Sequence, residues 1–167
     1  SPAIHKAGYA ELGIDFVYVA NRVEDLKSTL AGMRAMENFR GMSITIPHKI
    51  DAIQYVDEIP EMDRAIGSIN TVVNQNGQLI GSNTDGPGAM KAIEDAGVDL
   101  DGAHILMLGA GGASRAIAFT LAWDPRIKEM TLLDIDSELL DSLGKDLAGK
   151  TDTRIYTDVM DDDSLAA

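Results

Sequence analysis

A lysine and an aspartate, each next to small polar side chains, are the residues of this sequence best suited to move a proton. Lys49 closes the segment Thr45-Ile46-Pro47-His48-Lys49, and Asp85 lies within Gly81-Ser82-Asn83-Thr84-Asp85-Gly86. Oxidation of an alcohol removes a hydride from carbon and a proton from oxygen, and a positioned amine or carboxylate can accept that proton. Taken singly, Lys49 could be a surface charge and Asp85 the N-cap of a helix that begins at Gly86.

A glycine-rich turn further along the chain has the pattern of a phosphate-binding site. It follows the apolar segment 104–108 and precedes an expected helix, whose first backbone N–H groups would face an anion. Ser114 stands at the third glycine position of the G-x-G-x-x-G fingerprint. The predicted cofactor-binding residues of this turn are Gly109, Ala110, Gly111, Gly112 and Ala113.

An acid at the end of the next expected strand, Asp134, predicts which dinucleotide would bind. A carboxylate in this position accepts hydrogen bonds from the adenosine ribose and repels a 2′-phosphate. We therefore expect NAD as the cofactor, with NADP less favoured. The alternative role of Asp134 is a helix N-cap, which Asp136 or Ser137 would fill more naturally.

The elements expected around these residues follow two different patterns. Before residue 98 the sequence predicts a mixture of helices (2–12, 23–37, 48–56, 61–66, 86–96) and strands (15–20, 41–46, 69–74, 78–82). Asn76-Gly77 predicts a tight hairpin turn between the last two strands. After residue 98, apolar strands (104–108, 130–134, 154–159) alternate with helices (113–123, 138–147), as in a parallel sheet covered by helices.

We therefore expect an α/β protein with two domains. Residues 1–97 would form an α/β substrate domain with a mostly parallel sheet, and residues 98–167 a Rossmann dinucleotide-binding domain. Three strands are half of the usual six-stranded dinucleotide-binding sheet, and no strand precedes the first helix. We expect a fragment of a longer protein, which lacks the first strand of the substrate domain and the second half of the Rossmann domain.

The composition argues against several classes of partner. A net charge of −13 disfavours nucleic acid and anionic membranes. The sequence has no cysteine, and none of its histidines pair at metal-ligand spacing, so we expect no metal site. It also has no signal peptide and no apolar run long enough to span a membrane, which favours a cytoplasmic location. We expect a monomer or homodimer that binds a small molecule.

Five motifs stand in the order found in shikimate dehydrogenases, and the sequence resembles that family over nearly its whole length. They are Ser1-Pro2 with His5, SITIPHK (43–49), AIGSINT (65–71), GSNTDGPG (81–88) and GAGGASRAI (109–117). The resemblance implies reversible oxidation of a ring hydroxyl of shikimate or quinate, with Lys49 and Asp85 as the catalytic pair. It also implies substrate contacts from Ser1, Thr45, Asn70 and Asp85.

Other features of the resemblance bear on specificity. The segment that begins at Asp134 resembles the NAD-using quinate/shikimate branch, because the NADP-using branch has an Asn-Arg-Thr type segment there. Ser43 and Lys6 stand where the family usually has asparagine. Which member of the Lys49–Asp85 pair carries the proton is left open.

Two alternative functions differ from this reading. One is a dehydrogenase of the same plan that acts on a folate derivative, against which the segments 45–49 and 83–86 argue. The other is a truncated or non-catalytic module that binds shikimate or quinate. Turnover by the polypeptide would separate the enzyme from the binding module.

Overall fold

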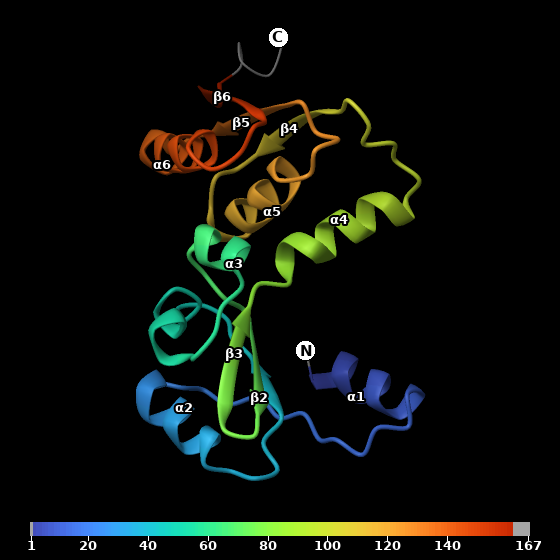
Figure 1. Ribbon diagram of the computed structural model, residues 1–167, viewed down its shortest axis with the longest axis vertical. Coiled ribbons are helices and arrows are strands. Elements are labelled where there is room, and N and C mark those ends of the chain that lie inside the picture. Colours follow the sequence, from blue (N-terminus) through green and yellow to red (C-terminus); the bar gives the residue numbers. More distant parts are fainter. Residues whose placement is uncertain (1, 162–167) are drawn as a thin grey trace.

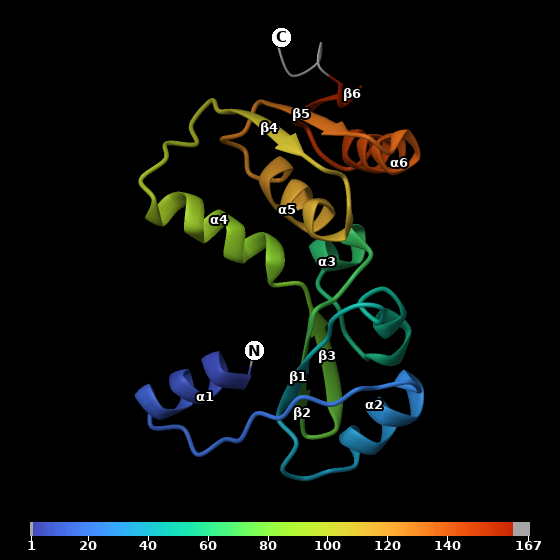
Figure 2. The ribbon, with the colours of Figure 1, turned by 180° about the vertical axis from the view of Figure 1, so that it is seen from behind.

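A computed structural model describes residues 2–161 and contains two three-stranded sheets, with helices between them (Figure 1). The first sheet has the order β1 (Gly41–Ser43), β2 (Thr71–Gln75) and β3 (Gln78–Ser82). Figure 2 shows the three strands side by side from behind.

All three strands of the first sheet pair antiparallel, with Val72 opposite both Met42 and Gly81. This differs from the expected mostly parallel sheet. The reason is the two-residue turn at Asn76 and Gly77, whose φ angles of 54° and 89° return the chain directly alongside β2. One isolated bridge, Glu58 to Ile80, is parallel.

The segment 15–20 does not form the predicted strand in the described part of the chain. It has no regular secondary structure and no ladder partner, and Val17 and Val19 are exposed. Alternating apolar residues do not make a strand without a neighbour whose backbone groups can pair with theirs. The segment instead contacts helix α1 (Pro2–Glu11), where the ring of Tyr18 stacks on His5 with centroids 4.1 Å apart.

The first unit has a small core beneath its sheet. Helix α2 (Leu26–Arg34) begins at its N-cap Asp25, whose carboxylate accepts a hydrogen bond from the Ser28 backbone N–H. The helix ends before Met36, which is exposed, and the 3₁₀ helix η1 (Asp51–Tyr55) follows later. The buried members of this core are Leu26, Leu30, Ile44, Ala52, Ile69, Val72 and Leu79.

The second sheet is parallel throughout and confirms the predicted α/β class with a half Rossmann unit. Its order is β4 (His104–Leu108), β5 (Glu129–Asp134) and β6 (Arg154–Val159). Helices α5 (Gly112–Ala122) and α6 (Ser137–Ala148) supply the crossovers and bury one face of the sheet.

Two helices that precede residue 98 pack against this second core. They are α3 (Glu61–Ile66) and α4 (Asp85–Asp95), both beside α5 in Figures 1 and 2. Ile66 is 1% exposed and belongs to the core that contains Ala116 and Phe119 of α5. The two units are therefore joined by packed helices rather than by a single linker.

Candidate active site

Lys49 and Asp85, 36 residues apart in the chain, meet at the end of the first sheet nearest the second unit. Lys49 lies in the turn between β1 and η1, and Asp85 is the first residue of α4, three positions after the end of β3. The Lys49 Nζ atom lies 2.8 Å from Asp85 Oδ2, and the two side chains are 29% and 30% exposed. A small molecule can therefore reach a pair whose charges are only partly screened by water.

Asn70 holds the other oxygen of the Asp85 carboxylate. Its Nδ2 donates to Asp85 Oδ1 over 2.7 Å. Its Oδ1 accepts hydrogen bonds from the Thr84 backbone N–H at 3.0 Å and from the Thr71 hydroxyl at 2.9 Å. These donors fix the orientation of the amide, so the carboxylate is held between an ammonium and an amide.

Asn83, which the sequence interpretation did not single out, supports the pair from behind. It is 3% exposed, and its Oδ1 accepts a hydrogen bond from the Asp85 backbone N–H at 3.0 Å. Its Nδ2 donates to both the carbonyl and the hydroxyl of Ser68. Because the donors and the acceptor of this buried amide are all paired, the Asn83 side chain is held in one orientation. The position of Asn83 two residues before Asp85 was the available signal.

The alternative role of Asp85 as an N-cap is wrong in this structure. Helix α4 begins at Asp85 itself, with Thr84 as N-cap, and the Asp85 side chain points to Lys49 and Asn70. The carboxylate is therefore available to a substrate rather than to its own helix.

The other residues predicted to contact the substrate are Thr45 and Ser1. Thr45 is exposed, and among residues 2–161 its hydroxyl has no protein hydrogen-bond partner, although its carbonyl accepts from the His48 backbone N–H. The His48 ring lies 2.9 Å from the Val23 carbonyl and so does not take part in the pair. Ser1 lies outside the described residues.

The glycine-rich turn has the backbone that a pyrophosphate needs. Gly109 has a φ of 103°, a backbone conformation that residues with a side chain rarely adopt. A Cβ added at Gly111 or Gly112 would meet nothing within 4 Å, so the approach to the backbone is open. Helix α5 starts at Gly112, and in the described residues no side chain caps it. These features, together with the neighbouring Ala110 and Ala113, fit a dinucleotide phosphate.

Asp134 accepts two backbone hydrogen bonds beside this turn. They come from the N–H groups of Asp136, at 2.8 Å, and Ala110. These two donors, Asp136 first, lower the pKa of the Asp134 carboxyl, so the group is ionised at neutral pH. The capping role belongs to Asp136, which accepts from the N–H groups of Glu138 and Leu139. Asp134 thus places a negative charge at the edge of the predicted cofactor site.

Asp63 on α3 is a buried acid next to the segment that supports the pair. It is 7% exposed, and burial raises the pKa of its carboxyl, while a hydrogen bond from the Asn83 backbone N–H opposes that rise. It is part of the surroundings of Asn83, not of the Lys49–Asp85 pair itself.

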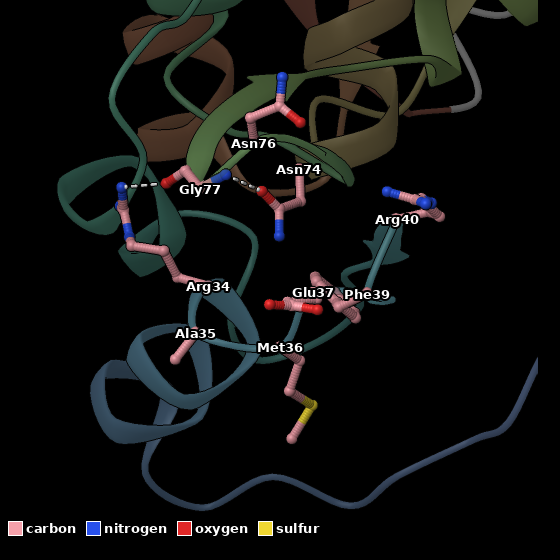
Figure 3. Close-up of a pocket in the computed structure, with 9 residues that line it drawn as sticks. All are labelled: Arg34, Ala35, Met36, Glu37, Phe39, Arg40, Asn74, Asn76 and Gly77. Atoms are coloured by element: carbon pink, nitrogen blue, oxygen red, sulfur yellow. Dashed lines mark hydrogen bonds between the residues drawn. The ribbon is translucent and has the colours of Figure 1, made fainter.

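The cavity shown in Figure 3 is not at the Lys49–Asp85 pair. It has a volume of about 330 Å³ and lies at the hairpin turn, the opposite end of β3 from Asp85. Its lining includes Arg34, Arg40 and Asn74. In the described part of the chain, no helix is long and apolar enough to cross a membrane, and no cluster of three acids or histidines could hold a metal.

The structure thus combines a half Rossmann unit, an open glycine turn and a lysine–aspartate pair. Residues 1–72 match the model of the shikimate dehydrogenase substrate binding domain. The chain is similar to members of the shikimate dehydrogenase family over most of its length.

Individual proteins extend the similarity beyond residue 72. The NADP(+) shikimate dehydrogenase of Methanococcus maripaludis is 43% identical over 152 residues, which cover 90% of this chain and 53% of the relative. The shikimate 5-dehydrogenase of Listeria monocytogenes, solved with shikimate and NAD, has a TM-score of 0.91 at 34% identity, covering 98% of this chain and 58% of that one. The 5-ketofructose reductase of Gluconobacter sp. strain CHM43 has a TM-score of 0.89 at 31% identity, covering 96% and 57%. The chain spans about half the length of the curated relative it matches.

Proposed function

We propose that the full-length protein is an oxidoreductase that interconverts a ring hydroxyl of shikimate or quinate and the corresponding ketone. The observation that carries this proposal is the 2.8 Å contact of Lys49 Nζ with Asp85 Oδ2, at a site about one-third exposed and backed by the Asn70 amide. Acid–base transfer of a hydroxyl proton requires a group within hydrogen-bonding reach of that hydroxyl, and the pair offers two.

The roles of the side chains follow from their donors and acceptors. When bound, the nicotinamide dinucleotide accepts or returns the hydride. Lys49 and Asp85 together take up the hydroxyl proton in one direction and return it in the other, and their direct contact lets the proton pass between them. Asn70 holds the carboxylate and presents its amide to a substrate hydroxyl. The exposed Thr45 hydroxyl contributes another hydrogen bond to the substrate, and Ser1 binds its carboxylate.

We propose NAD as the preferred cofactor. The support is the ionised Asp134 carboxylate beside Ala110, which would accept hydrogen bonds from ribose hydroxyls and repel a 2′-phosphate. The relative from Methanococcus maripaludis is named for NADP(+), whereas the Listeria monocytogenes structure contains NAD.

The test is a steady-state assay of the full-length protein that follows the absorbance of the reduced cofactor. Shikimate, quinate and the polyol form of 5-ketofructose are each combined with NAD and with NADP. We expect turnover with shikimate or quinate and a higher kcat/KM with NAD. Turnover of the sugar alone would contradict the substrate assignment. Calorimetric binding of shikimate without any turnover would support the non-catalytic module instead.

A further inference from the structure

Arg115, in the first turn of α5, contacts the end of α3, a helix that lies between Lys49 and Asp85 in the chain. Its Nε donates to the Ile66 carbonyl, and its Nη2 donates to the Ala65 carbonyl at 3.5 Å. The same Nη2 pairs with the Asp146 carboxylate on α6, and the guanidinium carbon lies 5.1 Å from the centre of the Phe119 ring. The side chain is 24% exposed and is held from several sides.

These contacts satisfy the carboxyl end of α3. The last carbonyls of a helix have no partner within the helix, and a cation there is favourable. Helix α3 ends at Ile66, and Gly67 follows with a φ of 78°. Lys150 adds a second cation at 3.3 Å from the Ala65 carbonyl. Because Ile66 is also buried against α5, the end of α3 is fixed to the second unit by both packing and charge.

The three residues that follow Gly67 each support the active pair. Ser68 accepts from Asn83, which in turn holds the backbone of Asp85. The Ile69 backbone N–H donates to the carbonyl of Lys49 at 2.9 Å. Asn70 donates to the Asp85 carboxylate. The position of segment 68–70 therefore sets the position of both members of the pair.

We propose that Arg115 is a positioning residue that sets the place of the Lys49–Asp85 pair relative to the glycine-rich turn. Arg115 lies three residues after Gly112. The helix that begins at the predicted phosphate site therefore also carries the side chain that binds the carboxyl end of α3 (Figure 1). The inference rests on the proposed function, because hydride transfer needs the substrate carbon and the cofactor at reacting distance. A displacement of about 1 Å at such a site costs up to about 10²-fold in rate.

The test compares three variants of the full-length protein. Arg115→Met keeps the length of the side chain but removes its donors, and Arg115→Lys keeps a cation. Arg154→Met is the matched control, because Arg154 pairs only with Glu129 among residues 2–161 and is 73% exposed. We expect Arg115→Met to lower kcat roughly 10- to 100-fold, while the separate dissociation constants of shikimate and NAD change less than about threefold. The deuterium isotope effect on the transferred hydrogen should rise, Arg115→Lys should recover part of kcat, and Arg154→Met should equal the wild type.

A second measurement does not depend on turnover. Amide hydrogen exchange of the cofactor-free protein should become faster at Ile69 and Asn70 in Arg115→Met but stay unchanged in β5. Unchanged kcat, or faster exchange spread equally over both units, would overturn the proposal. A wild-type protein without turnover would contradict the proposed function instead, and the exchange data would still decide the role of Arg115.

Discussion

At Asp85, one carboxylate oxygen faces an ammonium and the other faces an amide, so a substrate hydroxyl must share these partners rather than find free ones. Such a site discriminates by geometry, since a ligand that disturbs the arrangement leaves a partly buried charge without its full set of partners. The two side chains of the pair are each exposed at about one-third of their surface, so the pair is accessible to a small molecule.

Replacing Lys49 tests the acid–base role directly. Lys49→Ala should lower kcat by about 10²- to 10⁴-fold, because proton transfer loses one of its two groups. Shikimate affinity, measured by calorimetry, should fall far less. Lys91→Ala is the control, since Lys91 forms a lysine–aspartate pair with Asp95 that is largely exposed and lies on the outside of α4. Equal effects of the two substitutions would contradict a special role for Lys49.

Asp134 offers a test of cofactor choice. Asp134→Ala should weaken NAD binding by roughly tenfold, through loss of a charged hydrogen bond, and should raise the affinity for NADP relative to NAD. Because the carboxylate also accepts from Ala110, Asp134→Asn is a second variant, which removes the charge but keeps one oxygen to accept the hydrogen bond from the Ala110 N–H. Asp141→Ala, at an exposed position on α6, is the control. If both Asp134 variants kept the NAD-to-NADP preference of the wild type, Asp134 would not be the residue that selects the cofactor.

The buried Asp63 predicts a pH dependence of stability. Because its pKa is raised in the folded state, the folded protein binds this proton more tightly than the unfolded chain does. The wild type should therefore lose stability relative to Asp63→Asn as pH rises from about 4 towards 7. Urea denaturation of both proteins across this range measures the difference. Asp152→Asn, which is exposed, should show no such trend.

At the scale of elements, local signals predicted most of the fold. The hairpin followed from Asn76-Gly77. The strands 104–108 and 154–159 were predicted with the bounds that the structure shows, because strands and helices alternate regularly after residue 98. The segment 15–20 failed as a strand because pairing depends on a neighbour that composition does not reveal. Likewise Lys49 and Asp85 could be singled out by type, whereas Arg115 could not, since its partners are backbone carbonyls 49 and 50 residues away.

The packing of α4 on α5 depends on one glycine. A Cβ at Gly86 would lie 1.9 Å from Thr120 Oγ1 and 2.7 Å from the Ala116 carbonyl oxygen, so the helices could not approach as they do. Gly86→Ala should lower the free energy of unfolding by about 1–3 kcal/mol. Gly88→Ala is the matched control on the same helix, because a Cβ there meets nothing within 4 Å, and it should raise stability by up to about 1 kcal/mol. Urea denaturation checks both, and a similar effect at the two positions would contradict the packing argument.

At the scale of the whole molecule, two hydrophobic cores are built from different helices. The first core lies beneath the antiparallel sheet, and the second extends from β5 through α5 to Ile66 of α3. Because Ile66 shortly precedes segment 68–70, the second core helps to fix the segment that contacts Lys49 and Asp85.

This arrangement predicts that the two units unfold together. Ile66→Ala should cost about 2–5 kcal/mol by leaving a cavity at the joint. In the wild type, hydrogen exchange should give similar opening free energies for the amides of β2 and of β5. In Ile66→Ala the opening free energies of the two strands should differ. Ile50→Ala, at a side chain that is 69% exposed, should leave both unchanged. Parallel loss of protection in the two strands would argue for a single core.

Strand β4 pairs only with β5 among residues 2–161, and its side chains Leu106 and Leu108 are 61% and 59% exposed. The unpaired backbone N–H and C=O groups along such an edge, next to apolar side chains, can form hydrogen bonds with strands of other copies of the chain. We therefore expect concentrated solutions of this polypeptide to form fibrils and precipitates, opposed mainly by electrostatic repulsion between chains of net charge −13. Salt, by screening that repulsion, would hasten the loss of material during purification.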